Sequence, residues 1–193
     1  VVAEPPVLLM DESLSALDLK LREDLQEEIR RLHRELGTTV VFVTHDQGEA
    51  LTLSDRIALM NAGRICQLDA PGALYDRPAS RFVADFIGRT NLVPVDDGAH
   101  AAALGLERVA DGVVALSLRP EKLTRAPGPS DRGFDAVVQD VAFRGATLEL
   151  RLRAASGLVL RLSEPRAGAL PPPALGETIR IGFAQEDATP LYE

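Results

Sequence analysis

Two adjacent carboxylates, Asp11 and Glu12, follow directly on the apolar run Val7-Leu8-Leu9-Met10. A short continuous apolar run is typical of a strand that is buried on both faces of a parallel sheet. The carboxyl ends of such strands open on the crevice where ligands bind. Neighbouring acids repel each other, and a bound metal ion relieves that repulsion. These residues alone leave two interpretations open: a metal-dependent site, or acids that cap a helix or face solvent after an ordinary strand.

The segment after these acids is predicted to form an amphipathic helix. Apolar residues recur there at intervals of three and four positions, as on one face of a helix; they are Leu21, Leu25, Ile29, Leu32 and Leu36. The other faces carry charged residues, including Arg22. Asp18 stands where an N-cap residue is expected, and Gly37 stands where glycine commonly ends a helix.

A second apolar and β-branched run, residues 38–44, leads into His45 and Asp46. A helix between two strands indicates a right-handed crossover and parallel pairing. Parallel neighbours end at the same edge of a sheet, so we expect His45 to lie near Asp11 and Glu12. A nucleotide hydrolase needs a carboxylate that holds Mg²⁺, a base that orients water and a polar group near the γ-phosphate. Asp11, Glu12 and His45 are candidates for these three roles, in that order.

The remainder of the chain changes from mixed α/β character to short β-strands. Strands are predicted at 56–60 and 64–68, around a turn in which Gly63 supplies a positive φ. Helical pieces follow at 73–75 and 80–87. From about Asn91 onward, five short strands separated by turn residues predict a small barrel; they lie near 113–118, 134–143, 147–153, 157–163 and 178–183. Residues 167–176 are predicted to be a loop.

Composition excludes several classes of protein. The 193 residues are 46% hydrophobic and 26% charged, as in an ordinary globular protein, and the formal net charge is −8 at pH 7. This acidic balance disfavours a nucleic-acid partner. The single cysteine, Cys66, excludes an internal disulfide framework. No apolar run reaches the roughly 18 residues that span a bilayer, and no basic, signal-like segment opens the chain. We therefore expect a reducing, cytoplasmic location.

Several motifs resemble those of ATP-binding-cassette (ABC) ATPases, in the order and at the spacing of that family. Residues 7–12 resemble the Walker B strand, residues 15–18 (Ser-Ala-Leu-Asp) the D-loop, and residues 40–47 the strand and switch histidine of the H-loop. Residues 75–78 and 82–88 resemble the linker of importer ATPases of the maltose, polyamine and ferric-iron type. Residues 118–121 (Leu-Arg-Pro-Glu) resemble the entry to their accessory oligomer-binding-fold-like domain, called TOBE.

This resemblance implies a role for each matching residue. Asp11 would hold Mg²⁺, Glu12 would polarise the hydrolytic water, and His45 would contact the γ-phosphate of ATP. Asp18 would reach across a dimer interface toward the second nucleotide, in addition to or in place of its role as a helix cap. The implied partners are a second copy of the ATPase, transmembrane permease subunits and an extracytoplasmic solute-binding protein, at the cytoplasmic face of the membrane.

The implied fold is the C-terminal half of a P-loop, RecA-like cassette followed by a small all-β, OB-fold-like barrel. We expect a partial ATPase domain at 1–75, a helical linker at 76–92 and a TOBE domain at 93–193. The sequence contains no G-x-x-x-x-G-K-[ST] phosphate loop, signature motif or Q-loop. These motifs are expected upstream of Val1, so the chain alone is expected to be inactive.

The transported solute is less clearly indicated. The form Asp-Glu-Ser-Leu-Ser-Ala-Leu-Asp at 11–18 and the segment 143–149 are similar to spermidine/putrescine importer ATPases. Ferric iron and sugars are the alternatives. A different class of function also stays open, in which the β domain binds a small anion or a regulator and the α/β part is a non-catalytic scaffold.

Overall fold

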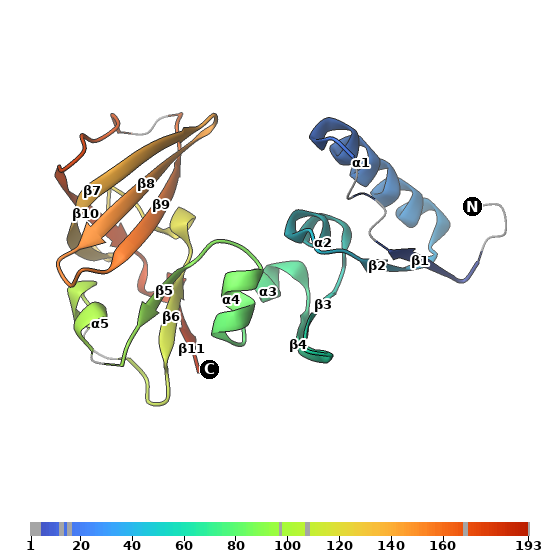
Figure 1. Cartoon of the computed structure of the whole chain (residues 1–193), viewed down its shortest axis with the longest axis horizontal. Coiled ribbons are helices and arrows are strands. Elements are labelled where there is room, and N and C mark those ends of the chain that lie inside the picture. Colours follow the sequence, from blue (N-terminus) through green and yellow to red (C-terminus); the bar gives the residue numbers. More distant parts are fainter. Residues whose placement is uncertain are drawn as a thin grey trace. The chain divides into compact units, whose positions relative to one another are not determined.

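The structure is a computed structural model. It describes residues 5–192 except 12–13, 15–16, 97, 107–108 and 168–169, with only the backbone at Leu19. The chain divides into two compact units, Val1–Asp76 and Arg77–Glu193 (Figure 1). Residues 77–92, which the sequence assigns to a linker, belong to the second unit. None of the described helices is both long and apolar enough to cross a membrane.

The first unit begins with a parallel βαβ arrangement. Strands β1 (Val7–Asp11) and β2 (Thr39–Val43) pair in parallel, from Val7 opposite Thr39 to Asp11 opposite Val43, and α1 (Leu19–Leu36) connects them. The Asp18 carboxylate accepts a 3.0 Å hydrogen bond from the Leu21 amide, and Gly37 ends the helix with a φ of 61°. Both predicted caps are confirmed.

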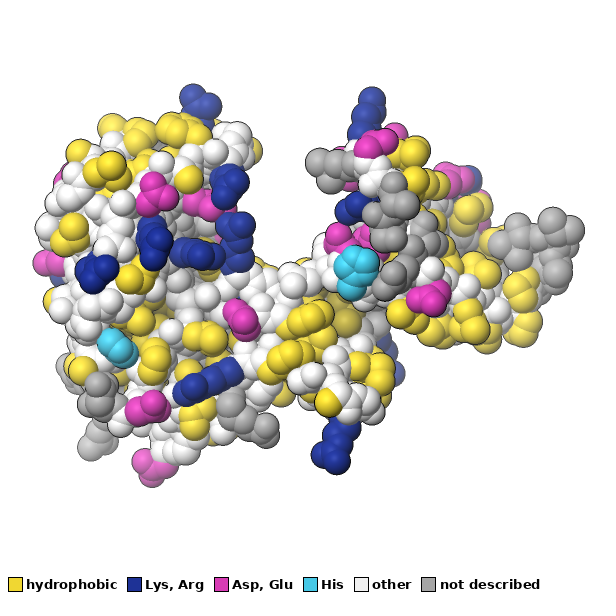
Figure 2. Space-filling model, viewed as in Figure 1, with side chains coloured by type: hydrophobic (Ala, Val, Ile, Leu, Met, Phe, Trp, Pro, Cys, Tyr) yellow, Lys and Arg dark blue, Asp and Glu magenta, His cyan; other side chains and the backbone are white. Residues whose placement is uncertain are grey.

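The prediction that these two strands are buried on both faces is wrong for the described residues. Burial alternates along β1 and β2: the side chains of one face are half-buried, whereas Leu9 is 75% exposed and Val43 54% exposed on the other. Helix α1 lies along one side of the pair (Figure 1), and no described element of this unit covers the opposite side. Figure 2 shows hydrophobic side chains at the surface of the first unit.

A short helix and a hairpin complete the first unit. Helix α2 (Gln47–Leu53) begins directly after Asp46, whose side chain caps it. Strands β3 (Ile57–Asn61) and β4 (Arg64–Asp69) pair antiparallel, and α3 (Pro71–Asp76) follows. The predicted positive φ of Gly63 is confirmed at 74°.

The second unit contains two antiparallel sheets, in the strand orders β10-β7-β8-β9 and β11-β6-β5. Its elements are α4 (Arg81–Phe86), β5 (Asn91–Pro94), α5 (Ala99–Ala103), β6 (Ala115–Leu118), η1 (Pro120–Lys122), β7 (Arg132–Arg144), β8 (Thr147–Ala154), β9 (Val159–Pro165), β10 (Thr178–Phe183), η2 (Gln185–Asp187) and β11 (Ala188–Leu191). The predicted small β domain is present, but its described strands form two sheets around a shared core and outnumber the five predicted. Sequence analysis missed β5 and β11, which are four-residue edge strands that each contain a proline.

The core of the second unit is filled from the alternating strands. Leu148, Leu150 and Leu152 of β8 are at most 2% exposed, while Arg151 and Arg153 face solvent. The strand predicted near 147–153 is thus confirmed, with one face in the core and the other in solvent. Phe183 of β10 is 1% exposed, and its ring lies 6.4 Å from that of Phe134 in an edge-on arrangement.

A buried arginine ties α4 to the β-sheets. Arg119 follows β6 and is 5% exposed. Its Nη1 atom donates to the carbonyl oxygens of Ala84 and Gly88, both at 3.0 Å, and of Arg89 at 3.2 Å. One guanidinium therefore satisfies carbonyls at and beyond the end of α4, where the helix itself leaves them unpaired.

Arg119→Met is expected to lower the free energy of unfolding of the second unit by about 2–4 kcal/mol, because it leaves these carbonyls without their charged donor. Hydrogen exchange of the β6 amides measures the loss. The control, Arg151→Met on the exposed face of β8, should change it by less than about 1 kcal/mol. Equal effects of the two substitutions would contradict the anchoring role of Arg119.

Candidate functional site

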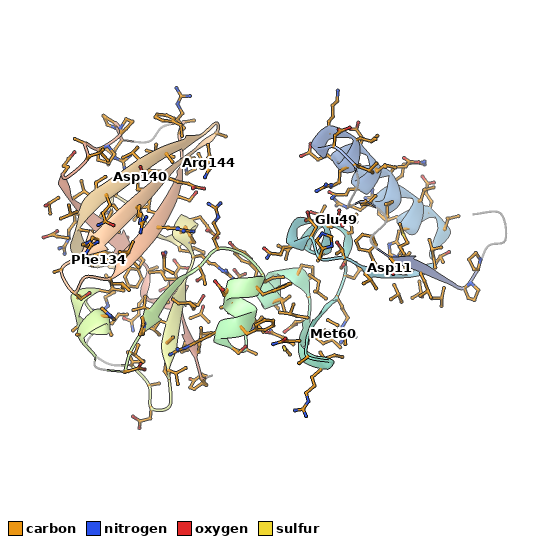
Figure 3. The ribbon with its side chains drawn as sticks, viewed as in Figure 1. Asp11, Glu49, Met60, Phe134, Asp140 and Arg144 are labelled. Atoms are coloured by element: carbon orange, nitrogen blue, oxygen red, sulfur yellow. The ribbon has the colours of Figure 1, made fainter. Side chains whose placement is uncertain are left out.

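Two of the predicted site residues, Asp11 and His45, leave the carboxyl-terminal edge of the β1–β2 pair. Asp11 is the last residue of β1 and lies opposite Val43, the last residue of β2 (Figure 3). Thr44 and His45 follow directly, so the expectation that Asp11 and His45 leave the same edge of the sheet is confirmed. Both are exposed. Glu12, the predicted base, lies outside the described residues.

The segment between β1 and α1 carries the predicted D-loop. Leu14 is buried at 3% exposure and its carbonyl accepts a 3.2 Å hydrogen bond from the Leu17 amide. Ser15 and Ala16 lie outside the described residues. Asp18 is exposed and caps α1. Its proposed reach toward a second nucleotide stays a prediction.

A polar network that sequence analysis missed lies behind this edge. Its centre is Glu49 of α2, which is 1% exposed (Figure 3). The Thr44 hydroxyl donates to Glu49 Oε2 at 2.6 Å and accepts from the Asp46 amide at 3.0 Å. Asp46 in turn accepts from the Glu49 amide at 3.0 Å. Residues 44–46, which include the predicted switch histidine, are thus pinned to the start of α2.

Arg22 joins the same network from α1. Its Nη1 donates to Asp46 Oδ2 at 3.2 Å, and its Nη2 donates to the Leu17 carbonyl at 3.0 Å. Its Nε lies 3.9 Å from Glu49 Oε1. The prediction that Arg22 belongs to a charged outer face is therefore wrong: its side chain is only 24% exposed. A buried carboxylate is tolerated when a cation lies beside it, and Arg22 supplies that cation.

The described residues fit a metal that arrives with a phosphate ligand. Mg²⁺ is usually held by one or two protein carboxylates together with substrate phosphates, and not by a cage made only of protein. Asp11 offers an exposed carboxylate of this kind at the strand edge. Within the described ranges, no group of three or more His, Cys, Asp or Glu side chains could hold a metal ion by itself.

Comparison with known proteins identifies both units. Residues 116–191 match the model of the TOBE domain. The chain is 40% identical over 205 aligned residues to spermidine/putrescine import ATP-binding protein PotA 1 of Pseudomonas aeruginosa. The alignment covers 98% of the chain and 55% of that protein. It is 43% identical to the PotA protein of Rubrobacter xylanophilus, with 94% of the chain and 52% of that protein covered. It is 46% identical to sulfate/thiosulfate import ATP-binding protein CysA 2 of Chromobacterium violaceum, with 81% and 46% covered.

The chain spans about half the length of the curated relatives that it matches. Asp11 at the strand edge, the histidine loop and the two β-sheets fit one class of protein, the import ATP-binding proteins. The chain matches the C-terminal part of ABC importer ATP-binding proteins and carries a TOBE domain. The resemblance inferred from the motifs is confirmed.

Proposed function

We propose that the chain is part of the energy-coupling ATPase subunit of a solute importer. The observation that carries the proposal is the parallel β1–β2 register, which brings Asp11 and the His45 loop to one edge of the sheet. The alternative, a non-catalytic binding module, does not explain why acids and a histidine leave the same edge.

In this proposal the chain contributes part of a nucleotide site. A bound Mg²⁺ neutralises charge that develops on the phosphates during hydrolysis. Asp11 is the residue that would hold it. Glu12 orients the attacking water, and His45 contacts the γ-phosphate. The phosphate-binding loop and the signature motif are absent from the sequence, so the β- and γ-phosphates need groups that these 193 residues do not supply.

The open face of the β1–β2 pair supports the same view. Leu9, Val41 and Val43 expose about half or more of their side chains there, at 75%, 48% and 54%. Burying such apolar surface stabilises a protein by about 25 cal/mol per Å². We infer that further elements of a complete cassette cover this face. The complete protein would act as a homodimer on permease subunits and a solute-binding protein, at the cytoplasmic side of the membrane.

ATP hydrolysis tests the proposal directly. We would join the chain to the N-terminal part of the P. aeruginosa relative, replacing the region that the two share; this protein is called the chimera below. The chimera is expected to release phosphate from Mg-ATP, and the 193-residue chain alone is not. Glu12→Gln should reduce the steady-state turnover of the chimera by about 100-fold or more, because the water loses its base.

The matched control is Glu27→Gln on the exposed face of α1, which should leave turnover within about twofold. A chimera that binds ATP but is insensitive to Glu12→Gln would contradict the catalytic assignment and favour the binding-module alternative. Steady-state hydrolysis by the chain alone, abolished by Glu12→Gln, would contradict the inferred need for the remaining cassette.

For the solute, we propose a polyamine, since several relatives are named for spermidine/putrescine import. The CysA relative makes sulfate the strongest competitor. Uptake of labelled spermidine and of labelled sulfate should be compared in cells whose complete protein carries Glu12→Gln. Loss of sulfate uptake with spermidine uptake retained would overturn the polyamine assignment.

A further inference from the structure

Arg22 makes contacts with two loops that leave different strands. One is the loop after β1, which it reaches through the Leu17 carbonyl at 3.0 Å; the other is the loop after β2, which it reaches through Asp46 at 3.2 Å. Along the sequence, α1 and β2 lie between the two loops. Because the guanidinium is planar and its donors point in fixed directions, it sets the relative position of the two acceptors.

Glu49 is the third residue that faces the Arg22 guanidinium, after Leu17 and Asp46. One of its carboxylate oxygens is occupied by the Thr44 hydroxyl at 2.6 Å. The other, Oε1, faces Arg22 Nε at 3.9 Å, and both of these atoms are buried without a hydrogen-bond partner. Removing one partner of a buried ion pair is strongly destabilising, because the other charge is left uncompensated. Arg22 therefore cannot leave its place without exposing the buried charge of Glu49.

From this geometry we propose that Arg22 is a positioning residue that couples the loop bearing Asp18 to the loop bearing His45. The inference rests on the proposed function, in which His45 serves one nucleotide and Asp18 reaches toward the second. Arg22 then contacts both loops, so a change at one nucleotide site alters the loop that serves the other. Its guanidinium is directed at Leu17, Asp46 and Glu49, so in this proposal it acts on turnover through the two loops.

Arg22→Lys tests this coupling in the chimera. Lysine keeps the positive charge beside Glu49, but a single ammonium cannot reproduce the planar fork that spans Leu17 and Asp46. Turnover at saturating ATP is expected to fall about 10- to 100-fold, since loss of a supporting contact misplaces the groups that act on substrate. The KM for ATP should stay within about threefold. The control, Arg30→Lys on the exposed face of α1, should leave both values unchanged.

A double-mutant cycle with His45→Ala separates positioning from general damage to the fold. If Arg22 acts through the His45 loop, Arg22→Lys should cause little further loss of turnover once His45 is alanine. An equal fold-loss in both backgrounds would overturn the proposal. So would turnover within twofold of wild type for Arg22→Lys alone.

A second variant separates loss of coupling from loss of the fold. Arg22→Met combined with Glu49→Met removes both charges and keeps similar volume, a replacement that folded proteins often tolerate. It should fold, as judged by circular dichroism and ATP binding, and still show the loss of turnover; normal turnover would overturn the coupling. If the wild-type chimera itself fails to hydrolyse ATP, the proposed function is wrong, and the coupling that depends on it is wrong with it.

Discussion

Asp11→Asn is expected to lower ATP hydrolysis by the chimera about 100-fold or more. Asparagine has the same shape but lacks the negative charge that the proposed Mg²⁺ site requires of Asp11. A loss of about 3 kcal/mol of transition-state stabilisation corresponds to this factor, and metal ions supply several kcal/mol in such reactions. Asp11 lies exposed at the end of β1, so the fold should survive. Phosphate release measured against Mg²⁺ concentration checks the prediction.

The Mg²⁺ dependence distinguishes loss of a ligand from loss of structure. The Asp11→Asn chimera should need a higher Mg²⁺ concentration for half-maximal activity than the wild type. Asp24→Asn, an equivalent change on the exposed face of α1, should leave both the rate and the Mg²⁺ dependence unchanged. An Asp11→Asn protein with the wild-type Mg²⁺ dependence would contradict the metal-binding role of Asp11.

Local sequence signals predicted the framework of this edge well. The caps at Asp18 and Gly37 depend on a few neighbouring residues, and parallel pairing follows from a strand–helix–strand order. The burial of the strands could not be predicted in the same way. The apolar run at 7–10 is typical of a strand covered on both faces, and whether a cover is present depends on residues outside the run.

The Arg22–Glu49 network was missed for a related reason. On a helix with many charged residues, Arg22 has no local feature that separates it from its neighbours. Its partner Asp46 lies 24 positions away along the chain, so the contact exists only after β1 and β2 have paired. One signal was available in the sequence. Glu49 stands three residues after Asp46, which is the spacing of a capping box at the start of a helix.

The second unit shows where periodicity is a sufficient signal and where it is not. The eight residues of β8 alternate strictly in burial, and the strand itself was predicted from the sequence. Strands β5 and β11 have four residues each, too few for an alternation to stand out. They are recognisable only from their pairing with the two edges of β6. The prediction of five strands in one barrel therefore missed these two strands, which form a second sheet with β6.

Phe183→Ala is expected to lower the free energy of unfolding of the second unit by about 3–5 kcal/mol, the largest stability effect that we predict. Phe183 is 1% exposed and its ring packs edge-on against Phe134, with 6.4 Å between the ring centres. Both residues lie on strands of the four-stranded sheet, at paired ends of β7 and β10. Removing the ring opens a cavity that the two strands cannot close without losing their register.

Hydrogen exchange of β7 and β8 amides in the 193-residue chain measures this loss, because these central strands exchange only when the unit opens. The matched control is Phe143→Ala, at the far end of β7. Its ring is 59% exposed and contacts the Arg166 side chain, 5.4 Å from the ring centre. This control should cost less than about 1 kcal/mol. Similar losses for the two variants would mean that the core of the second unit lies elsewhere than between its two sheets.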